Sequence, residues 1–435
     1  MAYNRKQRLN DNIKAIETAF ILDREQRTPT ARERLLLERY CGFGGLKCIL
    51  NPARELADAV HWAKSDLELF APTVELHRLI RENSKNESEY KQLMDSLKQS
   101  VLTAFYTPSA ITEALTDVLK EHQIIPEKVL EPSAGIGAFV DSVLDNNPKA
   151  DIMAFEKDLL TGKILRHLHP EQKVRIEGFE KIEKPFNDYF DLAISNIPFG
   201  DVAVFDPSYT AMKGMRALVT RRIHNYFFVK ALDTVRDGGL VAFITSQGVL
   251  NAKNNSAARF MMLYHADLVS AIRLPNNLFT ENANTEVGSD LIILQKNTQK
   301  ESLRGDDNLL DTVYNDENRI PTNNYFLEHP ERIIHTTAKL DTDPFGKPAM
   351  IYTHEDGVEG IAEELRKMLN EDFGRNFHLS RYLGEEQTTS WNGGRNRGNL
   401  HLGTENLHRL QSKTPYGIRG NGGRGNQNRR NQNWG

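Results

Sequence analysis

The spacing of apolar residues changes about a quarter of the way along the chain. From residue 10 to about residue 100, apolar residues recur every three or four positions among many charged ones, which predicts amphipathic helices. Gly42 to Gly45 and Pro52 interrupt this pattern, as expected for turns. From Lys128 onward, short runs rich in Val, Ile and Phe alternate with helical stretches. That alternation predicts a mainly parallel sheet covered by helices on both faces.

Seven apolar runs in this second region predict seven strands. The last two have no helical pattern between them, so we expect an antiparallel pair at the edge of the sheet. The expected fold class is therefore α/β, with a seven-stranded Rossmann-like sheet. The predicted strands span residues 128–131, 151–155, 173–177, 190–196, 239–246, 268–274 and 290–296.

Composition and pattern divide the chain into four segments. Residues 1–100 are expected to form a helical N-terminal cap, and residues 101–300 the sheet domain. Residues 301–385 are mixed, with one helix predicted at 360–370, and we assign them no role. Residues 386–435 are dominated by Gly, Asn and Arg, and they have too few aliphatic side chains to offset the entropy cost of ordering. We expect a disordered tail, which either binds nucleic acid nonspecifically or serves as a solubilising tether.

A loop with two glycines follows the first predicted strand and precedes a helical pattern. Gly135 and Gly137 allow the backbone to approach a bound nucleoside, since ligands of open α/β sheets bind beyond the carboxyl ends of the strands. A plain tight turn explains a lone Gly-x-Gly about as well. However, Glu156 comes at the end of the next strand, 21 residues after Gly135, where an acid can accept both hydroxyls of a ribose. The sequence has no full dinucleotide fingerprint and no phosphate-binding Gly-Lys-Ser/Thr loop, which argues against NAD and ATP.

The tetrapeptide Asn196-Ile197-Pro198-Phe199, at the end of the fourth predicted strand, suits the binding of an exocyclic amine. An aromatic amino group is a poor nucleophile because its lone pair is delocalised, so an enzyme must hold its hydrogens in acceptors. The side-chain oxygen of Asn196 and the carbonyl of Ile197 are such acceptors. Pro198 turns the chain, and Phe199 offers a π-face to a flat base. The structural alternatives are a turn cap for Asn196 and a core position for Phe199.

The order of these elements resembles that of the N6-adenine DNA methyltransferases of the gamma class. In that family a Phe/Tyr-Thr-Pro element precedes the S-adenosylmethionine loop, and Asn-Pro-Pro-Phe/Tyr comes later. The resemblance implies S-adenosyl-L-methionine as cofactor and methyl transfer to adenine N6 in DNA, with the base flipped out of the duplex. Ile197 stands where the first Pro is usual, which removes one φ restraint but keeps the carbonyl. The resemblance implies cofactor binding by Phe105, Tyr106, Thr107, Glu131, Ser133, Ala134, Gly135, Gly137, Glu156 and Phe179, and catalysis by Asn196, Ile197, Pro198 and Phe199.

The resemblance covers residues 101–296. Fainter matches at 40–46 and 324–330 are similar to a subgroup carried by mobile elements, in which the methyltransferase is often fused to a helicase. This implies a restriction-modification or anti-restriction role, with a specificity or helicase partner. The aromatic pair before Thr107 and Pro108 is also an ordinary packing device at a helix start, so its cofactor contact stays one of two interpretations.

The formal charge of −4 hides an asymmetry that matters for an enzyme acting on DNA. Residues 391–435 carry eight Lys or Arg against Glu405 alone, so residues 1–390 carry a net −11. Phosphate contacts must therefore come from a local patch. The best candidate is Lys213, Arg216, Arg221 and Arg222, although a solvated loop with ordinary charges explains these residues equally well.

The remaining composition narrows the class of protein. Cys41 and Cys48 are too few for a disulfide framework or a zinc cluster, and the 13 histidines are scattered. We therefore expect no metal. No stretch approaches the roughly 20 apolar residues of a membrane span, and the first residues have no apolar signal core. We expect a cytoplasmic protein without a membrane partner.

Three hypotheses remain open from the sequence. The first is an N6-adenine DNA methyltransferase. The second is a methyltransferase for RNA or a protein glutamine, since related tetrapeptides occur there, although the element at 105–108 favours DNA. The third is a catalytically inactive methyltransferase fold that binds DNA, suggested by Ile197, the acidic body and the lack of an obvious target-recognition domain.

Overall fold

The computed structural model describes most of the chain up to residue 385. Phe105, Lys213 and the tail from residue 386 lie outside the described residues, so the expectations for them stay predictions. The described ranges are 4–103, 106–212, 214–280, 286–303, 307–314, 319–343 and 346–385.

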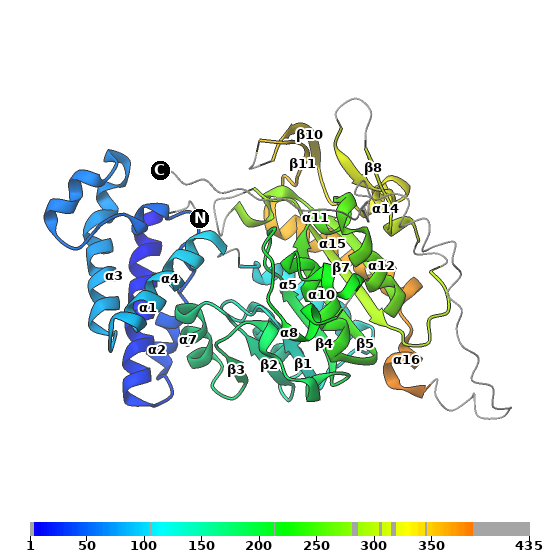
Figure 1. Ribbon diagram of the computed structural model, residues 1–435, viewed down its shortest axis with the longest axis horizontal. Coiled ribbons are helices and arrows are strands. Elements are labelled where there is room, and N and C mark those ends of the chain that lie inside the picture. Colours follow the sequence, from blue (N-terminus) through cyan, green and yellow to red (C-terminus); the bar gives the residue numbers. More distant parts are fainter. Residues whose placement is uncertain are drawn as a thin grey trace, which may run out of the picture. The chain divides into compact units, whose positions relative to one another are not determined.

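Seven strands form one sheet in the order β3-β2-β1-β4-β5-β7-β6 (Figure 1). All neighbouring pairs are parallel except those of β7, which runs antiparallel to both β5 and β6. This confirms the predicted α/β fold class and the antiparallel pair at the edge. The strands are β1 (Lys128–Glu131), β2 (Asp151–Phe155), β3 (Lys173–Arg175), β4 (Phe190–Asn196), β5 (Val235–Ser246), β6 (Ala266–Leu274) and β7 (Ser289–Lys296).

Helices cover both faces of the sheet, which explains why its strands are nearly continuous apolar runs. Side chains alternate along each strand, so Val129 joins one buried cluster and Leu130 the other. α10 packs against β5 on one face, and α15 packs against α5 and β6 on the other. The helices around the sheet are α5 (Ser109–Glu121), α6 (Ala138–Asn146), α7 (Leu159–Leu168), α8 (Pro207–Thr210), α9 (Met215–Val219), α10 (Ile223–Thr234), α11 (Gly248–Asn251) and α12 (Ser256–His265).

The N-terminal segment is helical, as predicted. Its long helices share a third apolar cluster, to which α7 of the sheet domain contributes as well. In Figure 1 these blue helices lie beside α7. Asn4 caps the first helix, and a capping box at Thr30 begins the second. The helices are α1 (Arg5–Glu25), α2 (Ala31–Leu37), α3 (Phe70–Glu82) and α4 (Glu87–Thr103), with short turns η1 (Lys47–Leu50), η2 (Leu56–His61) and η3 (Lys64–Leu69).

Residues after the last strand of the sheet return to it. The predicted helix at 360–370 lies within α15, whose Asp372 accepts a hydrogen bond from Ser270 of β6 (2.7 Å) and pairs with Arg332 (2.9 Å). The segment therefore completes the cover of the sheet. Its elements are β8 (Thr312–Tyr314), β9 (Pro321–Asn323), α14 (Asn324–Glu328), β10 (Thr337–Thr342), β11 (Pro348–Thr353), α15 (Gly357–Asn376) and α16 (Leu379–Leu383).

Short 3-10 turns connect several of these elements. They are η4 (Phe179–Lys181), η5 (Lys184–Phe186), η6 (Lys253–Asn255), η7 (Asn276–Phe279), η8 (Asp307–Leu309) and η9 (Pro330–Arg332). In the described part of the chain, none of the helices combines the length and apolar character needed to cross a bilayer.

Candidate active site

The predicted site residues converge at the carboxyl ends of β1, β2 and β4. These strands are neighbours and parallel, so their ends meet at one edge of the sheet. The loop after β1 is tied to the end of β2 by a hydrogen bond from Ala134 N to the Phe155 carbonyl (2.8 Å). It is tied to β4 by Ser195 Oγ, which donates to the Ser133 carbonyl (3.2 Å). The glycine loop and the tetrapeptide therefore adjoin each other.

Both loop glycines are required by conformation and by contact. Gly135 has φ of +56°, and a Cβ there would lie 2.9 Å from Cε1 of Tyr106. Gly137 has φ of +94°, and a Cβ there would lie 2.6 Å from Nε2 of His169 and 2.8 Å from Cδ1 of Leu165. L-residues rarely adopt such φ values, so only glycine fits at either position without strain. The loop forms a close-packed cradle with Tyr106 over its backbone.

Glu131 ends β1 with its side chain only 2% exposed. Within the described residues its Oε2 finds no hydrogen-bond partner. Burial, and then the charges of Asp141 and Glu156, raise the pKa of Glu131 well above its usual value. A buried oxygen of this kind is costly unless a ligand supplies a donor.

Glu156 follows β2 and is held by two backbone donors. Gly135 N donates to its Oε2 (2.8 Å), and Asp158 N donates to its Oε1 (2.7 Å). Loss of hydration, and then the charge of Asp158, raise the pKa of Glu156 to about 8. The acid is thus fixed against the glycine loop, and its side chain is half-buried.

The tetrapeptide begins on the last residue of β4 and continues into a loop. Ile197 N donates to the Ile244 carbonyl of β5 (2.9 Å), and the Ile197 side chain is only 1% exposed. Phe199 is half-buried and meets Phe279 edge to face, with ring centroids 6.2 Å apart. Pro198 is half-buried too, and Gly200 has φ of +140°.

Three predicted cofactor residues lie in different surroundings. Thr107 is buried just before α5, and the Tyr106 hydroxyl lies 3.4 Å from Thr161 Oγ1. Phe179 is 1% exposed and packs its ring against Phe155 and Phe227, with centroids 5.9 Å and 5.3 Å away. It belongs to the apolar core, and its contact with a cofactor stays a prediction.

Three residues of the predicted basic cluster, Arg216, Arg221 and Arg222, lie in the described part of the chain, and their contact with DNA stays a prediction. The guanidinium of Arg216 makes two hydrogen bonds to Asp233 (2.6 and 2.9 Å), so Arg216 is paired with an acid on a half-buried part of the surface. Arg222 bonds Asn254 (2.9 Å) and lies 3.3 Å from Asp201. Arg221 is exposed, as a phosphate contact requires.

Sequence reasoning missed residues that support this site from a distance. Asp158 accepts from Thr161 N (2.7 Å) and so caps α7, and Ser96 of α4 donates to Asp158 (2.7 Å). An Asp just before a helix was a recognisable capping signal, but its partner 62 residues away was not.

A cavity of about 340 Å³ lies beside the glycine loop, with walls from both Tyr40 of the N-terminal segment and Ile136.

A family model described as N-6 DNA Methylase matches residues 88–351, more than half of the chain. The chain belongs to this family. S-adenosylmethionine, which carries an electrophilic methyl group, is the cofactor of this chain. The glycine cradle, the unsatisfied Glu131 oxygen and the fixed acid Glu156 fit a nucleoside cofactor of this kind.

The chain is similar to two curated proteins over part of their length. It is 29% identical over 201 residues to Defense against restriction protein B of Escherichia phage P1, covering 45% of this chain and 8% of that protein. It is 25% identical over 173 residues to Type II methyltransferase M.XamI of Xanthomonas campestris pv. amaranthicola, covering 37% of this chain and 33% of that protein. The match thus spans a third or less of each relative.

Solved structures of restriction-modification enzymes are among those similar to the methylase. An ATP-dependent Type ISP enzyme, LlaBIII, aligns with TM-score 0.39 and 13% identity over 85% of this chain and 28% of that chain. The type IIG restriction endonuclease BpuSI aligns with TM-score 0.38 and 16% identity over 68% and 38%. Among the described residues, no group of three or more His, Cys, Asp or Glu side chains is placed to hold a metal ion.

Proposed function

We propose that this methylase transfers the methyl group to the N6 amino group of adenine in DNA. The supporting observation is the position of the tetrapeptide. Asn196 ends β4, and its neighbour Ser195 bonds the Ser133 carbonyl of the glycine loop (3.2 Å). A pair of acceptors for an amino group therefore adjoins the loop proposed to hold the methyl donor.

Ile197 is compatible with this activity although it replaces the usual Pro. Its N–H extends the β4–β5 ladder by bonding the Ile244 carbonyl (2.9 Å), and its side chain is buried in the apolar cluster under β4. These two anchors restrain the direction of its carbonyl. A proline ring is then not needed to aim this acceptor.

The free energies are consistent with a flipped base. Extruding an adenine from the duplex costs a few kcal/mol. Stacking on Phe199 offsets roughly 1–3 kcal/mol of that cost. Phe279 meets Phe199 edge to face and so fixes the plane of the stacking ring. Most of the rate gain then comes from orientation, with Asn196 and Ile197 holding the amino hydrogens.

The segment after the tetrapeptide supports DNA as the substrate. Val202 and Phe205 are 62% and 76% exposed, although the segment is anchored on both sides of Phe205. Val204 N bonds the Thr220 carbonyl (2.8 Å), and Asp206 accepts from Tyr226 (2.7 Å). Apolar side chains held outward on a fixed loop suit insertion against bases. We propose that DNA approaches this loop and Arg221.

The biological role we propose is restriction-modification or defence against restriction. The names of the two curated relatives favour this role. A specificity or helicase partner is part of the proposal.

The test is long-read modification sequencing of host DNA with and without this protein, together with Asn196→Ala. We expect N6-methyladenine in a defined sequence context with the native chain. Asn196→Ala should lower methylation by about 10²-fold or more, by analogy with the loss of one positioned hydrogen-bonding group. Cofactor binding, measured by calorimetry, should change little. Asn187→Ala is the matched control, since Asn187 is exposed at the other end of β4.

Each contrary outcome has its own meaning. Loss of both methylation and cofactor binding in Asn196→Ala would indicate misfolding. Transfer of labelled methyl to RNA or protein, with none to DNA, would establish the second hypothesis. Normal DNA binding by the native chain without turnover on any sequence would establish the inactive binding fold.

A further inference from the structure

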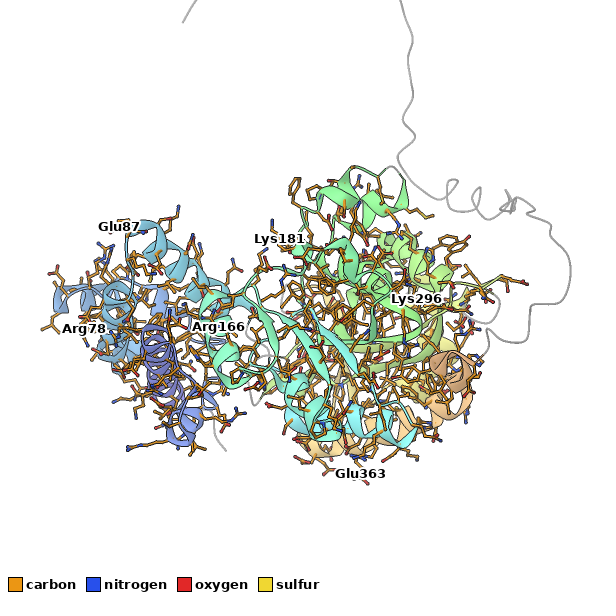
Figure 2. The ribbon with its side chains drawn as sticks, turned by 90° about the horizontal axis from the view of Figure 1, so that it is seen from below. Arg78, Glu87, Arg166, Lys181, Lys296 and Glu363 are labelled. Carbon is orange, nitrogen blue, oxygen red and sulfur yellow. The ribbon has the colours of Figure 1, made fainter. Side chains whose placement is uncertain are left out.

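The N-terminal helices are built into the helix that follows Glu156. Leu160, Ile164 and Leu168 of α7 belong to the same buried cluster as the core of α1 to α4. Asp23 of α1 adds polar contacts to Arg166 (2.8 Å, labelled in Figure 2) and His167 (2.9 Å) of α7. The N-terminal helices therefore hold α7 along its whole length.

A chain of hydrogen bonds leads from these helices to the glycine loop. Ser96 Oγ of α4 donates to Asp158 Oδ2 (2.7 Å) and accepts from Leu160 N (2.9 Å). Asp158 N donates to Glu156 Oε1 (2.7 Å), whose other oxygen accepts from Gly135 N (2.8 Å). One residue, Asp158, thus separates α4 from the proposed ribose-binding acid.

A second connection runs through two tyrosines. The hydroxyls of Tyr40 and Tyr106 lie 3.3 Å and 3.4 Å from Thr161 Oγ1. Thr161 N in turn donates to Asp158 Oδ1 (2.7 Å). Tyr40, Ser96 and Thr161 are 1%, 5% and 2% exposed, so water cannot easily replace these partners. Both oxygens of Asp158 are therefore fixed by buried groups.

These hydrogen bonds orient Asp158 relative to Glu156. Asp158 bonds Glu156 through its backbone N–H, and both side chains are acids, so two like charges in one enclosed place repel each other. Hydrogen bonds to a carboxylate are stronger at low dielectric, and they orient it. Without Ser96, Asp158 would lose one of its donors and would move relative to Glu156, whose Oε1 it holds.

We propose that the N-terminal helices form part of the cofactor site, with Ser96 and Tyr40 as positioning residues. They hold Asp158, and through it Glu156, in the orientation that receives a ribose diol. The inference rests on the proposed role of Glu156 as the ribose acceptor. The cavity between Tyr40 and Ile136 borders the same loop, so these helices also form one of its walls.

The experiment is calorimetric titration of the full chain with S-adenosylhomocysteine and with its 2′-deoxy analogue. We expect Ser96→Ala to weaken S-adenosylhomocysteine binding by about fivefold to tenfold, as loss of one buried hydrogen bond implies. Tyr40→Phe should weaken it by a smaller factor. Ser84→Ala is the matched control, because the Ser84 hydroxyl bonds the Ile80 carbonyl (2.6 Å) and does not bond Asp158, and this variant should bind S-adenosylhomocysteine as the native chain does.

The 2′-deoxy analogue separates positioning from general damage. If Ser96 acts through Glu156, Ser96→Ala should weaken the binding of the 2′-deoxy analogue only slightly, because this ligand lacks one of the ribose hydroxyls that Glu156 accepts. Likewise, Ser96→Ala should have little effect in a Glu156→Gln background, since residues that act through each other are not additive. Thermal unfolding of each variant without ligand checks that it folds.

Two results would overturn the inference, and they differ. If Ser96→Ala lowered the affinity for both ligands by the same factor, the serine would act only on the stability of the fold. Equal affinity of the native chain for the two ligands would contradict the proposed role of Glu156 as ribose acceptor, and the inference that rests on it. In that second case methyl transfer through Asn196 would still stand or fall by the sequencing experiment.

Discussion

The two halves of the active-site edge are constructed differently. On the β1–β2 side, polar groups bond one another inside an enclosure of the glycine loop, α7 and the N-terminal helices. On the β4–β5 side, a half-buried Phe199 leads into a loop that exposes Val202 and Phe205. An enclosed site suits a ligand that is the same in every turnover. An open apolar site suits a base that must arrive from a duplex and leave again.

The largest expected effect on the free energy of unfolding comes from a substitution in the enclosed half. Gly137→Ala places a Cβ 2.6 Å from His169 Nε2 at a φ of +94°. Backbone strain and overpacking together should lower the free energy of unfolding by about 3 kcal/mol. Chemical denaturation without ligand measures this. Gly374→Ala is the control, since its Cβ meets nothing within 4 Å and α15 should gain up to about 1 kcal/mol. Equal stability of the two variants would contradict the close packing of the loop.

A smaller effect is expected in the open half. Ile197→Pro restores the residue usual in the family but removes the N–H that bonds Ile244 and trims a buried side chain. We expect a loss of about 2 kcal/mol in the free energy of unfolding. Ile197→Val keeps the N–H and should cost about 1 kcal/mol. If the proline variant is as stable as the native chain and methylates faster, the ring restraint matters more than the ladder bond.

The smallest expected effect is the pH dependence of cofactor affinity. It concerns the enclosed half alone, because Glu156 lies there, and it can be measured on the native chain. Burial raises the pKa of Glu156 from 4.5 to about 8, so its contribution to stability is present below pH 4.5 and lost as pH rises through 8. Ribose hydroxyls donate to the ionised form. Cofactor affinity should therefore increase with pH, by at most about tenfold per unit, and level off above 8. Burial also raises the pKa of Asp158.

Calorimetry at pH 7 in two buffers of different ionisation enthalpy measures the proton released on binding. Glu156→Gln should abolish that release. Constant affinity between pH 6.5 and 8.5 in the native chain would show that Glu156 is already ionised before the cofactor binds.

Local patterns were sufficient for most of the sheet. The strands 128–131, 151–155 and 190–196 were predicted with their observed bounds, because each is a short apolar run with clear ends. The glycine loop and the tetrapeptide are adjacent because β1 and β4 are neighbours in the sheet, an order that the apolar runs alone did not predict.

Long-range pairs were not predictable from local patterns. The bond between Ser96 and Asp158 and the ion pair between Arg216 and Asp233 join residues whose own neighbourhoods carry no sign of the partner. The role of Phe179 was equally unpredictable. The local sequence around an aromatic residue after a turn is the same whether the side chain contacts a ligand or packs in the core. Only the tertiary packing distinguishes these cases.

The docking of α15 on α5 and β6 has a consequence for biosynthesis. The apolar face that contains Leu115 and Ile272 is closed by Leu365 and Leu369, which are translated about a hundred residues after the strand they cover. A nascent chain that has already made all seven strands still exposes this face to the ribosome surface and to chaperones. The last step of folding therefore waits for residues that belong neither to the glycine loop nor to the tetrapeptide.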